Sequence, residues 1–340
     1  MSERVVKVAM IGFGGIAKSH KRGYEHLAAE GAPIKLVAIC DINEEQFTKA
    51  QAINLEGVPK YDLSEQKLYT DLDQMLANEE FEMVDICLPS FLHKEYTLKM
   101  LRAGKHVLCE KPMALSSEDC REMIETAKAC GKKLMIGQCL RFEALYLFLK
   151  HAIEENTYGK VRYAYFDRLS AMPRWGFEGW YHDTARSGGA ILDLHIHDVD
   201  MVRFLFGEPK AVSCISYDME TENTVVNSRF LYGDDKIVVA NASWDEAGST
   251  KFTSPYRVRF EKAEIKLEGG KVMIYPNEGE VYEAQMARPD RMAEEIKCLA
   301  MSVLEGTENT QNPPESAMKT VALVEALRKS AAAQGAQVEF

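Results

Sequence analysis

The sequence predicts an α/β protein with two domains, a doubly wound parallel sheet in residues 1–138 and an α+β domain in residues 139–340. Strands and helices alternate as far as residue 137, which is typical of a parallel sheet with helices on both faces. A glycine-rich turn at Gly12–Ala17 joins the first strand to the first helix. Beyond residue 206 several strands follow one another without helices, which predicts an antiparallel or mixed sheet.

The first domain is expected to contain five strands and five helices. Buried strands are predicted where apolar and β-branched residues run together, and helices where apolar residues recur every three or four positions. The predicted strands are 5–11, 34–40, 83–88, 106–109 and 133–137, and the predicted helices are 18–30, 43–54, 71–77, 92–103 and 117–130.

The second domain begins with a predicted helix at 142–155, a strand at 160–169 and a loop rich in aromatic residues and arginine. A helix at 190–206 has too many apolar residues for one face, so it is expected to be buried almost all round. The remaining predicted strands are 211–217, 224–232, 236–244, 256–261, 265–267 and 272–275, followed by helices at 289–305 and 315–333. The terminal helix can pack back on the first domain.

The composition limits the possible partners and the compartment. With 340 residues, 46% hydrophobic and 27% charged, the chain is an ordinary soluble globular protein. A net charge of −11 without a dense basic cluster argues against nucleic acid as a partner. There is no signal peptide and no apolar run of membrane-spanning length, so we expect no membrane and a cytoplasmic location. Eight single cysteines without a CxxC pair indicate reduced thiols.

The turn after the first strand resembles a dinucleotide-binding fingerprint. Gly12 permits a tight turn, Gly14 lets a pyrophosphate approach the backbone, and Ala17 lets helix and strand pack closely. The helix N-terminus then offers N–H groups to the phosphates. Asp41 ends the second strand and fits the acidic residue that binds the adenosine ribose, which favours NAD over NADP. The alternatives are a plain glycine turn, and an Asp41 that only caps the following helix.

Ligands of parallel sheets lie beyond the carboxyl ends of the strands, so the residues at those ends are candidates for the site. Lys111 matters most, because the following proline restricts a lysine that directly follows a buried strand. It could instead be a surface lysine paired with Glu110. His93 could line the site or simply begin the next helix. The candidate cofactor-binding residues are Gly12, Phe13, Gly14, Gly15, Ile16, Ala17, Asp41, Pro89, His93, Glu110, Lys111 and Gln138.

The segment 187–198 concentrates residues that can move a proton. Asp193 and His197 are four residues apart, which on a helix makes them neighbours on one face, with Asp200 near the same stripe. His195 would point almost the opposite way. A buried carboxylate beside an imidazole is costly unless the pair is used, although it could be a structural pair that ties two elements together.

Taken together, these motifs resemble one family over the whole chain, the glucose–fructose oxidoreductase / inositol dehydrogenase (Gfo/Idh/MocA) family. The similarity is carried by Gly12–Ala17, Cys40-Asp41, the run from Ala103 through Glu110-Lys111-Pro112, Gln138 with Arg141-Phe142, and Ser187–Asp198. The glycine motif alone is unspecific. The Glu-Lys-Pro after the fifth Rossmann-type strand, combined with Gly-Gly-x-x-x-Asp-x-x-x-His, is highly specific.

The resemblance implies an N-terminal Rossmann domain and a C-terminal domain whose large open sheet often joins subunits, hence a homodimer or homotetramer. It implies an NAD(P)-dependent enzyme that acts on one CH–OH group of a sugar or cyclitol, as an inositol dehydrogenase does, with NADP the less favoured cofactor. By position, Lys111, Asp193 and His197 would be the catalytic group, and no metal is expected.

The chemistry of alcohol oxidation agrees with these residues. A neutral imidazole has suitable basicity near neutral pH, so His197 is the predicted base, oriented by Asp193. Lys111 would stabilise negative charge on the hydroxyl oxygen, or share the role of base. The candidates for binding the substrate are Arg141, Arg168, Trp175, Trp180, Asp193 and His197, of which the tryptophans lie in an aromatic loop that could equally be plain packing.

Three other functions remain open. A metal-dependent hydrolase would use His195 and His197, which face the same way only if the segment is a strand. A non-catalytic nucleotide-dependent sensor would lack the catalytic group. A glycosidase with tightly bound NAD would oxidise its sugar transiently and release no net NADH. The identity of the sugar, the direction of the reaction and the oligomeric state do not follow from the sequence.

Overall fold

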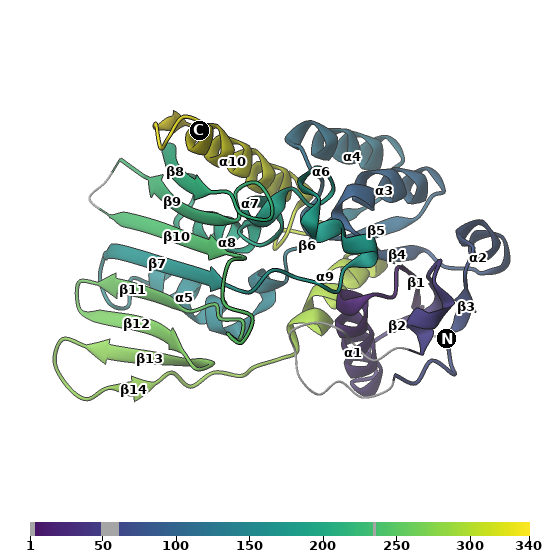
Figure 1. The fold of residues 1–340 in the computed structure, drawn as a ribbon. Coiled ribbons are helices and arrows are strands. Elements are labelled where there is room, and N and C mark those ends of the chain that lie inside the picture. Colours follow the sequence, from purple (N-terminus) through teal and green to yellow (C-terminus); the bar gives the residue numbers. More distant parts are fainter. Residues whose placement is uncertain (1–3, 49–60, 234–235) are drawn as a thin grey trace. The chain divides into compact units, whose positions relative to one another are not determined.

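The computed structural model describes residues 4–48, 61–233 and 236–340 and divides into two compact units. The first unit comprises residues 1–139 and 289–318, and the second comprises residues 140–288 and 319–340. The sequence places residues 289–318 in the second domain, whereas they group with the first because the helix at 291–305 packs on the first helix. Figure 1 shows the fold coloured along the chain.

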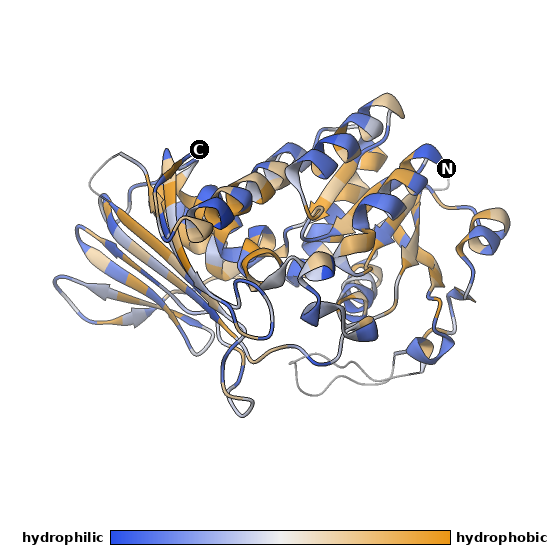
Figure 2. Cartoon of the chain, turned by 45° about the horizontal axis from the view of Figure 1, so that its top comes forward, coloured by the Kyte–Doolittle hydropathy of each residue, from blue (hydrophilic) through white to orange (hydrophobic). Residues whose placement is uncertain are grey.

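The first unit is built on a six-stranded parallel sheet in the order β3-β2-β1-β4-β5-β6. The order runs outward from β1 in both directions, so the sheet is doubly wound. Most of this sheet is orange in Figure 2, because most residues of its strands other than the edge strand at 67–69 are apolar and buried. They are β1 (Val6–Ile11), β2 (Ile34–Cys40), β3 (Lys67–Tyr69), β4 (Met83–Ile86), β5 (His106–Glu110) and β6 (Leu134–Gly137).

Helices connect these strands, as the sequence predicts. They are α1 (Gly15–Ala29), η1 (Glu44–Phe47), α2 (Leu72–Asn78), η2 (Ser90–Leu92), α3 (His93–Arg102) and α4 (Ser117–Ala129). Helix α9 (Arg291–Glu305) also belongs to this unit but follows the second sheet in the chain. Of the predicted helix 43–54 the structure describes only the short η1, and residues 49–54 lie outside the described part. Strand β3 has three residues and little apolar character, so the sequence analysis missed it.

Helix α9 packs closely on α1 at Gly23. A Cβ atom on Gly23 would lie 3.0 Å from the backbone nitrogen of Ala293 and 3.1 Å from the Ile296 side chain. A glycine in a helix interior is unfavourable by itself, so this close approach explains its presence. The contact makes α9 part of the first unit.

The second unit contains a nine-stranded sheet in the order β14-β13-β12-β11-β7-β10-β9-β8-β15. Only the pair β7 and β10 is parallel, so the sheet is mixed and mainly antiparallel. Its strands are β7 (Val161–Leu169), β8 (Ala211–Tyr217), β9 (Val225–Leu231), β10 (Ile237–Ser243), β11 (Tyr256–Phe260), β12 (Ala263–Glu268), β13 (Lys271–Pro276), β14 (Tyr282–Glu283) and β15 (Val338–Glu339).

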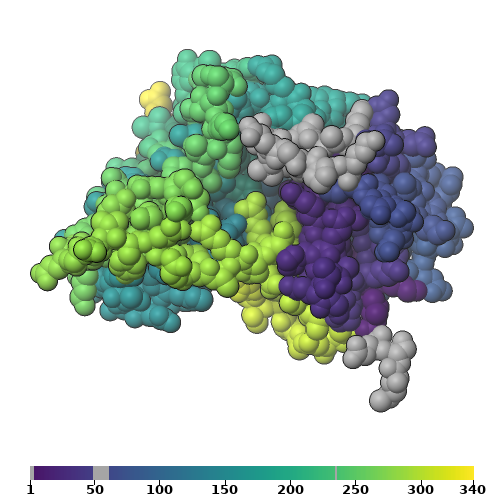
Figure 3. Space-filling view, turned by 90° about the horizontal axis from the view of Figure 1, so that it is seen from below, coloured from purple at the N-terminus to yellow at the C-terminus, as the bar shows by residue number. Residues whose placement is uncertain are grey.

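One face of this sheet is buried and the other is open. Alternate residues of β7 are buried, among them Ala164 and Phe166, whereas Tyr163 and Tyr165 between them are partly exposed. The alternation gives the mixed orange and blue strands of Figure 2. Strands β13 and β14 reach the surface in Figure 3, where they are yellow-green.

Helices cover the buried face, and the predicted helix at 190–206 is interrupted. The helices of this unit are η3 (Cys139–Phe142), α5 (Ala144–Glu154), η4 (Phe177–His182), α6 (Thr184–Ser187), α7 (Gly189–Asp193), α8 (Ile196–Phe206) and α10 (Pro314–Ala332), within which the division between the units falls. Helices α7 and α8 are separated by Leu194 and His195.

The interruption has the hydrogen-bond pattern of a π-bulge. The N–H of His195 donates to the carbonyl of Ala190, five residues back, at 2.8 Å, and the N–H of Leu194 donates to the same oxygen at 3.1 Å. The prediction of a single regular helix is therefore wrong. The predicted burial is confirmed, because only His197, Phe204 and Phe206 between Gly189 and Phe206 are partly exposed. Among the described residues no helix is both long and apolar enough to cross a membrane.

Candidate active site

The glycine turn of the first unit has the geometry that a dinucleotide requires. Gly12 has φ +86, and a Cβ there would lie 2.6 Å from the carbonyl oxygen of Cys87, so only glycine fits. At Gly14 an added Cβ would meet nothing within 4 Å, and α1 begins without a side-chain cap. Open space in front of an uncapped helix N-terminus suits an anionic group such as a pyrophosphate.

The predicted cofactor residues in this turn divide into two sets. Gly14, Gly15 and Ile16 are partly exposed at its surface, whereas Phe13 and Ala17 are fully buried. The ring of Phe13 lies against the rings of Phe47 and Tyr61, with centroids 6.2 Å apart in each case, and the small side chain of Ala17 lets α1 pack on the sheet. For Ala17 this is the role that the sequence predicts.

Asp41 is fixed to the glycine turn through its carboxylate. One oxygen accepts the N–H of Phe13 at 2.6 Å and the other accepts the N–H of Asn43 at 2.8 Å. Each oxygen keeps a second lone pair, so the carboxylate can still accept a hydrogen bond from a ribose hydroxyl. The cap of η1 is the Asn43 side chain, which accepts the N–H of Glu45, so Asp41 does not act as that cap.

The ends of β4 and β5 are joined by His93. Its Nδ1 lies 2.7 Å from the carbonyl oxygen of Pro112 and its Nε2 lies 2.8 Å from that of Leu88. Burial lowers the pKa of His93. Because both nitrogens face backbone carbonyls inside the protein, the geometry does not support His93 as a cofactor ligand. It begins α3 and holds the two strand ends, whereas the neighbouring Pro89 is partly exposed.

The Glu-Lys-Pro run follows β5 as predicted. Glu110 is buried and accepts the N–H of Lys111 at 3.0 Å, and the Lys111–Pro112 peptide is cis. The side chain of Lys111 is partly exposed. Gln138 follows β6 and is buried, and among the described residues its side-chain nitrogen has no hydrogen-bond partner.

In the second unit the acid and the imidazole lie on either side of the π-bulge. Asp193 is the last residue of α7 and is 8% exposed, and His197 is in the first turn of α8. His197 is the one polar residue between Ser187 and Asp200 that is partly exposed. The acid is thus held in the interior while the imidazole reaches the surface of this unit.

His195 serves a different purpose from His197. Its Nε2 lies 2.9 Å from the hydroxyl of Ser228 on β9, and burial lowers its pKa to about 3. The ring is therefore neutral and lies in the interior against the sheet. Of the described side chains, those that group into threes able to hold a metal ion include neither His195 nor His197. A two-histidine metal site at this segment is not supported.

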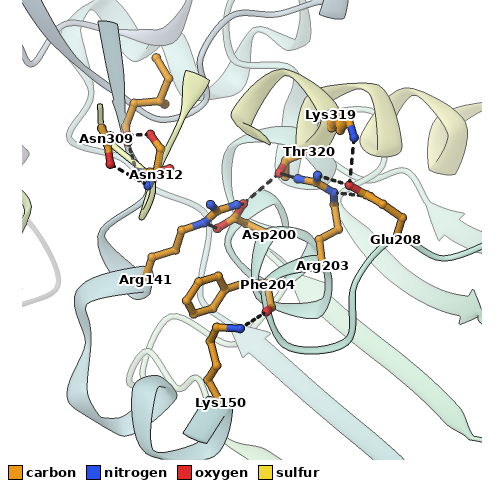
Figure 4. A network of polar contacts seen from close by, with 11 residues as sticks. Arg141, Lys150, Asp200, Arg203, Phe204, Glu208, Asn309, Asn312, Lys319 and Thr320 are labelled. Atoms are coloured by element: carbon orange, nitrogen blue, oxygen red, sulfur yellow. Dashed lines mark hydrogen bonds and ion pairs between the residues drawn. The ribbon is translucent and has the colours of Figure 1, made fainter. Parts of the chain in front are cut away.

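The two arginines predicted to bind substrate are engaged in buried ion pairs. The Nε and Nη2 atoms of Arg141 lie 2.8 and 2.7 Å from the carboxylate oxygens of Asp200 (Figure 4). Arg168 contacts Asp198 in the same way, at 2.7 and 3.0 Å. All four side chains are buried. Both arginines therefore fix α8 in place, a role that the sequence analysis did not assign to them.

The ion pair of Arg141 continues into a larger network (Figure 4). The hydroxyl of Thr320 on α10 donates to Asp200 at 2.9 Å and accepts from Arg203 at 2.5 Å. Arg203 also contacts Glu208 at 2.6 Å. Helix α8 is thus held to α10 by charge-assisted hydrogen bonds, which are stronger than neutral ones.

The aromatic loop before α6 packs mainly on itself. The ring of Trp180 stacks on Tyr181 with centroids 4.0 Å apart and is 7% exposed, so its predicted contact with substrate is not supported. A Cβ on Gly176 would lie 2.6 Å from the Tyr181 ring. Trp175 is 37% exposed and keeps a free surface.

The first unit also contains a buried polar cluster that was not predicted from the sequence, formed by His20, Tyr24, Asp85, Glu110 and Glu295. The sequence does contain a pattern that indicates this cluster. His20 and Tyr24 are four residues apart on α1, and Asp85 is a lone charge inside a buried strand, which requires a partner.

Comparison with known proteins identifies both parts of the chain. Residues 6–138 match the model described as "Oxidoreductase family, NAD-binding Rossmann fold", and residues 146–266 match the one described as "GFO/IDH/MocA C-terminal domain". The D-glucoside 3-dehydrogenase of Escherichia coli (strain K12) is 30% identical over 227 residues, 66% of this chain and 60% of that protein. The myo-inositol 2-dehydrogenase of Thermotoga maritima is 31% identical over 204 residues, 60% of this chain and 55% of that protein.

Solved structures agree in fold over nearly the whole chain. An aldose–aldose oxidoreductase from Caulobacter crescentus complexed with glycerol superimposes with a TM-score of 0.82 at 23% identity, covering 99% of this chain and 100% of that one. A levoglucosan dehydrogenase in complex with NADH gives a TM-score of 0.84 at 17% identity, covering 99% of each chain. The matched segments span about three fifths of the two curated relatives named above. This chain belongs to the Gfo/Idh/MocA oxidoreductase family, with an NAD-binding Rossmann fold in its first unit and the family's C-terminal domain in its second.

Proposed function

We propose that the protein is an NAD-dependent dehydrogenase that transfers a hydride between the nicotinamide and a secondary hydroxyl of a sugar or cyclitol. The observation that carries this proposal is the open, uncapped helix N-terminus behind Gly14, with the Asp41 carboxylate fixed beside it by Phe13. It is supported by relatives whose names are those of sugar and inositol dehydrogenases.

Bound NAD would supply the hydride acceptor, and the residues of the chain would handle the proton and the charge. His197 takes the hydroxyl proton, because a neutral imidazole has suitable basicity near pH 7. Asp193 orients the ring and stabilises the imidazolium that forms. Lys111 donates a hydrogen bond to the substrate oxygen and stabilises its developing negative charge.

The choice of cofactor follows from Asp41. Its carboxylate would repel the 2′-phosphate of NADP, while its unused lone pairs can accept from the ribose hydroxyls of NAD. The backbone of Gly12–Ala17 would hold the pyrophosphate, with Pro89 and Gln138 at the neighbouring strand ends. No metal is assigned a role.

Trp175 is the candidate contact for substrate that keeps an exposed ring. A flat aromatic face suits the apolar face of a sugar or cyclitol ring. The guanidinium groups of Arg141 and Arg168 would act on the substrate indirectly, by holding the helix that carries His197.

We also propose a homo-oligomer that assembles through the open face of the nine-stranded sheet. Ile215 and Tyr217 on β8 are 62% and 63% exposed, and Ile237 on β10 is 48% exposed. Exposed apolar side chains on an open sheet are typical of an interface.

A cytoplasmic location is proposed from the eight cysteines, all of which are free thiols.

The test is to incubate the purified protein with NAD or NADP and a panel of polyols, aldoses, cyclitols and nucleotide sugars, and to follow reduced cofactor by ultraviolet absorbance. His197→Ala and Lys111→Ala should each lower turnover by at least about a hundredfold while NAD binding persists. His151→Ala and Lys128→Ala, at exposed positions, serve as controls. Full activity in either active-site variant would contradict the role assigned to that residue. Sugar cleavage without net NADH would instead indicate a glycosidase.

A further inference from the structure

A histidine of the first unit lies between two buried carboxylates. His20 is on α1, its Nδ1 lies 2.9 Å from Asp85 on β4, and its Nε2 lies 2.9 Å from Glu110 at the end of β5. The side chains of His20 and Asp85 are 0% exposed and that of Glu110 is 5% exposed. The hydroxyl of Tyr24 also donates to Asp85, at 3.0 Å.

The two carboxylate partners favour a positively charged ring. Both partners of His20 are carboxylates, which accept hydrogen bonds, and only an imidazolium can donate from both nitrogens. Burial lowers the pKa of His20, but the charge and hydrogen bond of Asp85 outweigh it and raise that pKa well above 6.5. Burial likewise raises the pKa of Glu110, but the hydrogen bond and charge of His20 outweigh it, and that pKa is lowered.

Glu110 links His20 to the backbone of Lys111. One of its oxygens accepts from His20, and the other accepts the backbone N–H of Lys111 at 3.0 Å. The neighbouring strand β6 also limits the movement of this carboxylate, because even a Cβ on Gly137 would lie only 3.1 Å from one of its oxygens. Helix α1 is thus joined through two hydrogen bonds to the backbone of the residue assigned to stabilise the substrate oxygen.

Other titratable groups lie close to His20 and its two carboxylate partners. The thiol of Cys87, which directly follows β4, lies 3.5 Å from Asp85, and Glu295 on α9 is fully buried near His20 and Glu110. Arg291 on α9 and His93 on α3 also act electrostatically on these acids. Among the described residues both carboxyl oxygens of Glu295 have no hydrogen-bond partner. Burial, followed by the charge of Glu110, raises the pKa of Glu295 well above 4.5, which favours the neutral acid beside the ion pair.

We propose that His20 is a positioning residue that acts through Glu110 to hold Lys111 in its working orientation. The proposal rests on the proposed function, since it assumes that Lys111 stabilises the substrate oxygen. A misplacement of about 1 Å in a positioned group can cost as much as a hundredfold in rate, so a lost contact at Glu110 should be measurable.

Two substitutions of His20 separate its two contacts. In His20→Gln the side-chain amide reaches the position of Nε2, so it keeps the bond to Glu110 and loses the one to Asp85. In His20→Asn the amide reaches only the position of Nδ1, so it keeps the bond to Asp85 and loses the one to Glu110. Both variants remove the charge and each loses one contact, so their comparison shows, without a difference in charge, which of the two contacts matters for Lys111. Tyr24→Phe, which removes only a bond to Asp85, is the control.

The first readout is steady-state kinetics with NAD and an active polyol. His20→Asn should lower kcat by about tenfold or more with an unchanged Kd for NAD, whereas His20→Gln and Tyr24→Phe should stay within about threefold of wild type. A purely structural role would lower the stability of all three variants and leave kcat alone. Equal losses of kcat in both His20 variants would overturn the proposal.

The second readout does not depend on activity. Hydrogen exchange, measured by mass spectrometry on a peptide spanning residues 109–113, reports the Lys111 amide that Glu110 accepts. This amide should exchange about tenfold faster in His20→Asn and at the wild-type rate in His20→Gln. Unchanged exchange in His20→Asn would refute the link between His20 and Lys111. A metal ion that stays bound to His20 and Glu110 after dialysis would also refute it, because the metal would take the place of the proton on Nε2. If no polyol is oxidised, the proposed function fails and this measurement still decides the link.

Discussion

Replacing Glu295 by glutamine should change how stability depends on pH. Glu295 lies on α9, is 0% exposed, and has no hydrogen-bond partner for its carboxyl group among the described residues. Burial, followed by the charge of Glu110, raises its pKa well above 4.5. In the folded protein the group therefore stays protonated at pH values where it ionises in the unfolded chain.

The direction in which the free energy of unfolding changes with pH follows from the number of protons bound in the folded and unfolded states. Above the unfolded pKa the unfolded chain has lost a proton that the folded chain keeps, so the free energy of unfolding falls as the pH rises towards the folded pKa. One proton corresponds to a slope of at most about 1.4 kcal/mol per pH unit. Glutamine has the same shape and does not titrate. The stability of Glu295→Gln relative to wild type should therefore increase by as much as about 2.7 kcal/mol between about pH 5.5 and about pH 7.5.

The assay is urea unfolding at three pH values across this range, followed by circular dichroism and fitted with an intermediate where the two units unfold separately. Glu305→Gln, at the exposed end of the same helix, is the matched control and should show no such trend. A difference between Glu295→Gln and wild type that does not change with pH would mean that Glu295 is ionised in the folded protein. The inference of a neutral buried acid would then be wrong.

The remaining predictions concern the cofactor. Gly12→Ala should lower stability by about 1–3 kcal/mol and abolish NAD binding, because its Cβ would lie 2.6 Å from the Cys87 carbonyl oxygen in a left-handed backbone. In Gly14→Ala the added Cβ meets nothing within 4 Å, so this variant should fold normally and only bind NAD more weakly. Thermal unfolding measures the stability of the two glycine variants and calorimetric titration measures their NAD binding. If both variants behaved alike in the two measurements, the roles assigned to Gly12 and Gly14 would be wrong. Asp41→Ala should weaken NAD binding and reduce discrimination against NADP, measured as two dissociation constants; an unchanged preference would exclude the ribose assignment.

The sequence determined the elements whose signals are local. The strands of the first unit were predicted because runs of apolar residues need burial on both faces, and Gly12 and Asp41 were found because a turn and a strand end are properties of a few adjacent residues. The weak strand β3 was missed, since its three residues have no apolar run and form a strand only by pairing with β2.

The roles of buried charges could not be predicted in the same way. Arg141, Arg168 and His93 were expected at the site because arginines and a histidine near strand ends can bind ligands. Their partners, Asp200, Asp198 and two backbone carbonyls, come from other elements. An arginine or histidine at such a position either binds a ligand or stabilises the fold through internal ion pairs and hydrogen bonds. Only the residues that surround it in space distinguish these two roles.

By itself the sequence determined the two-part α/β architecture, the cofactor turn and the acid–imidazole spacing, because hydrophobic periodicity and glycine geometry act over a few residues. Only the tertiary structure decided that the helix breaks between Asp193 and His197, that α9 belongs to the first unit, and that His20 lies between Asp85 and Glu110. Each of these depends on contacts between residues far apart in the chain. Burial then fixes which of them carry charge, since an ion without a partner is too costly to keep in the interior.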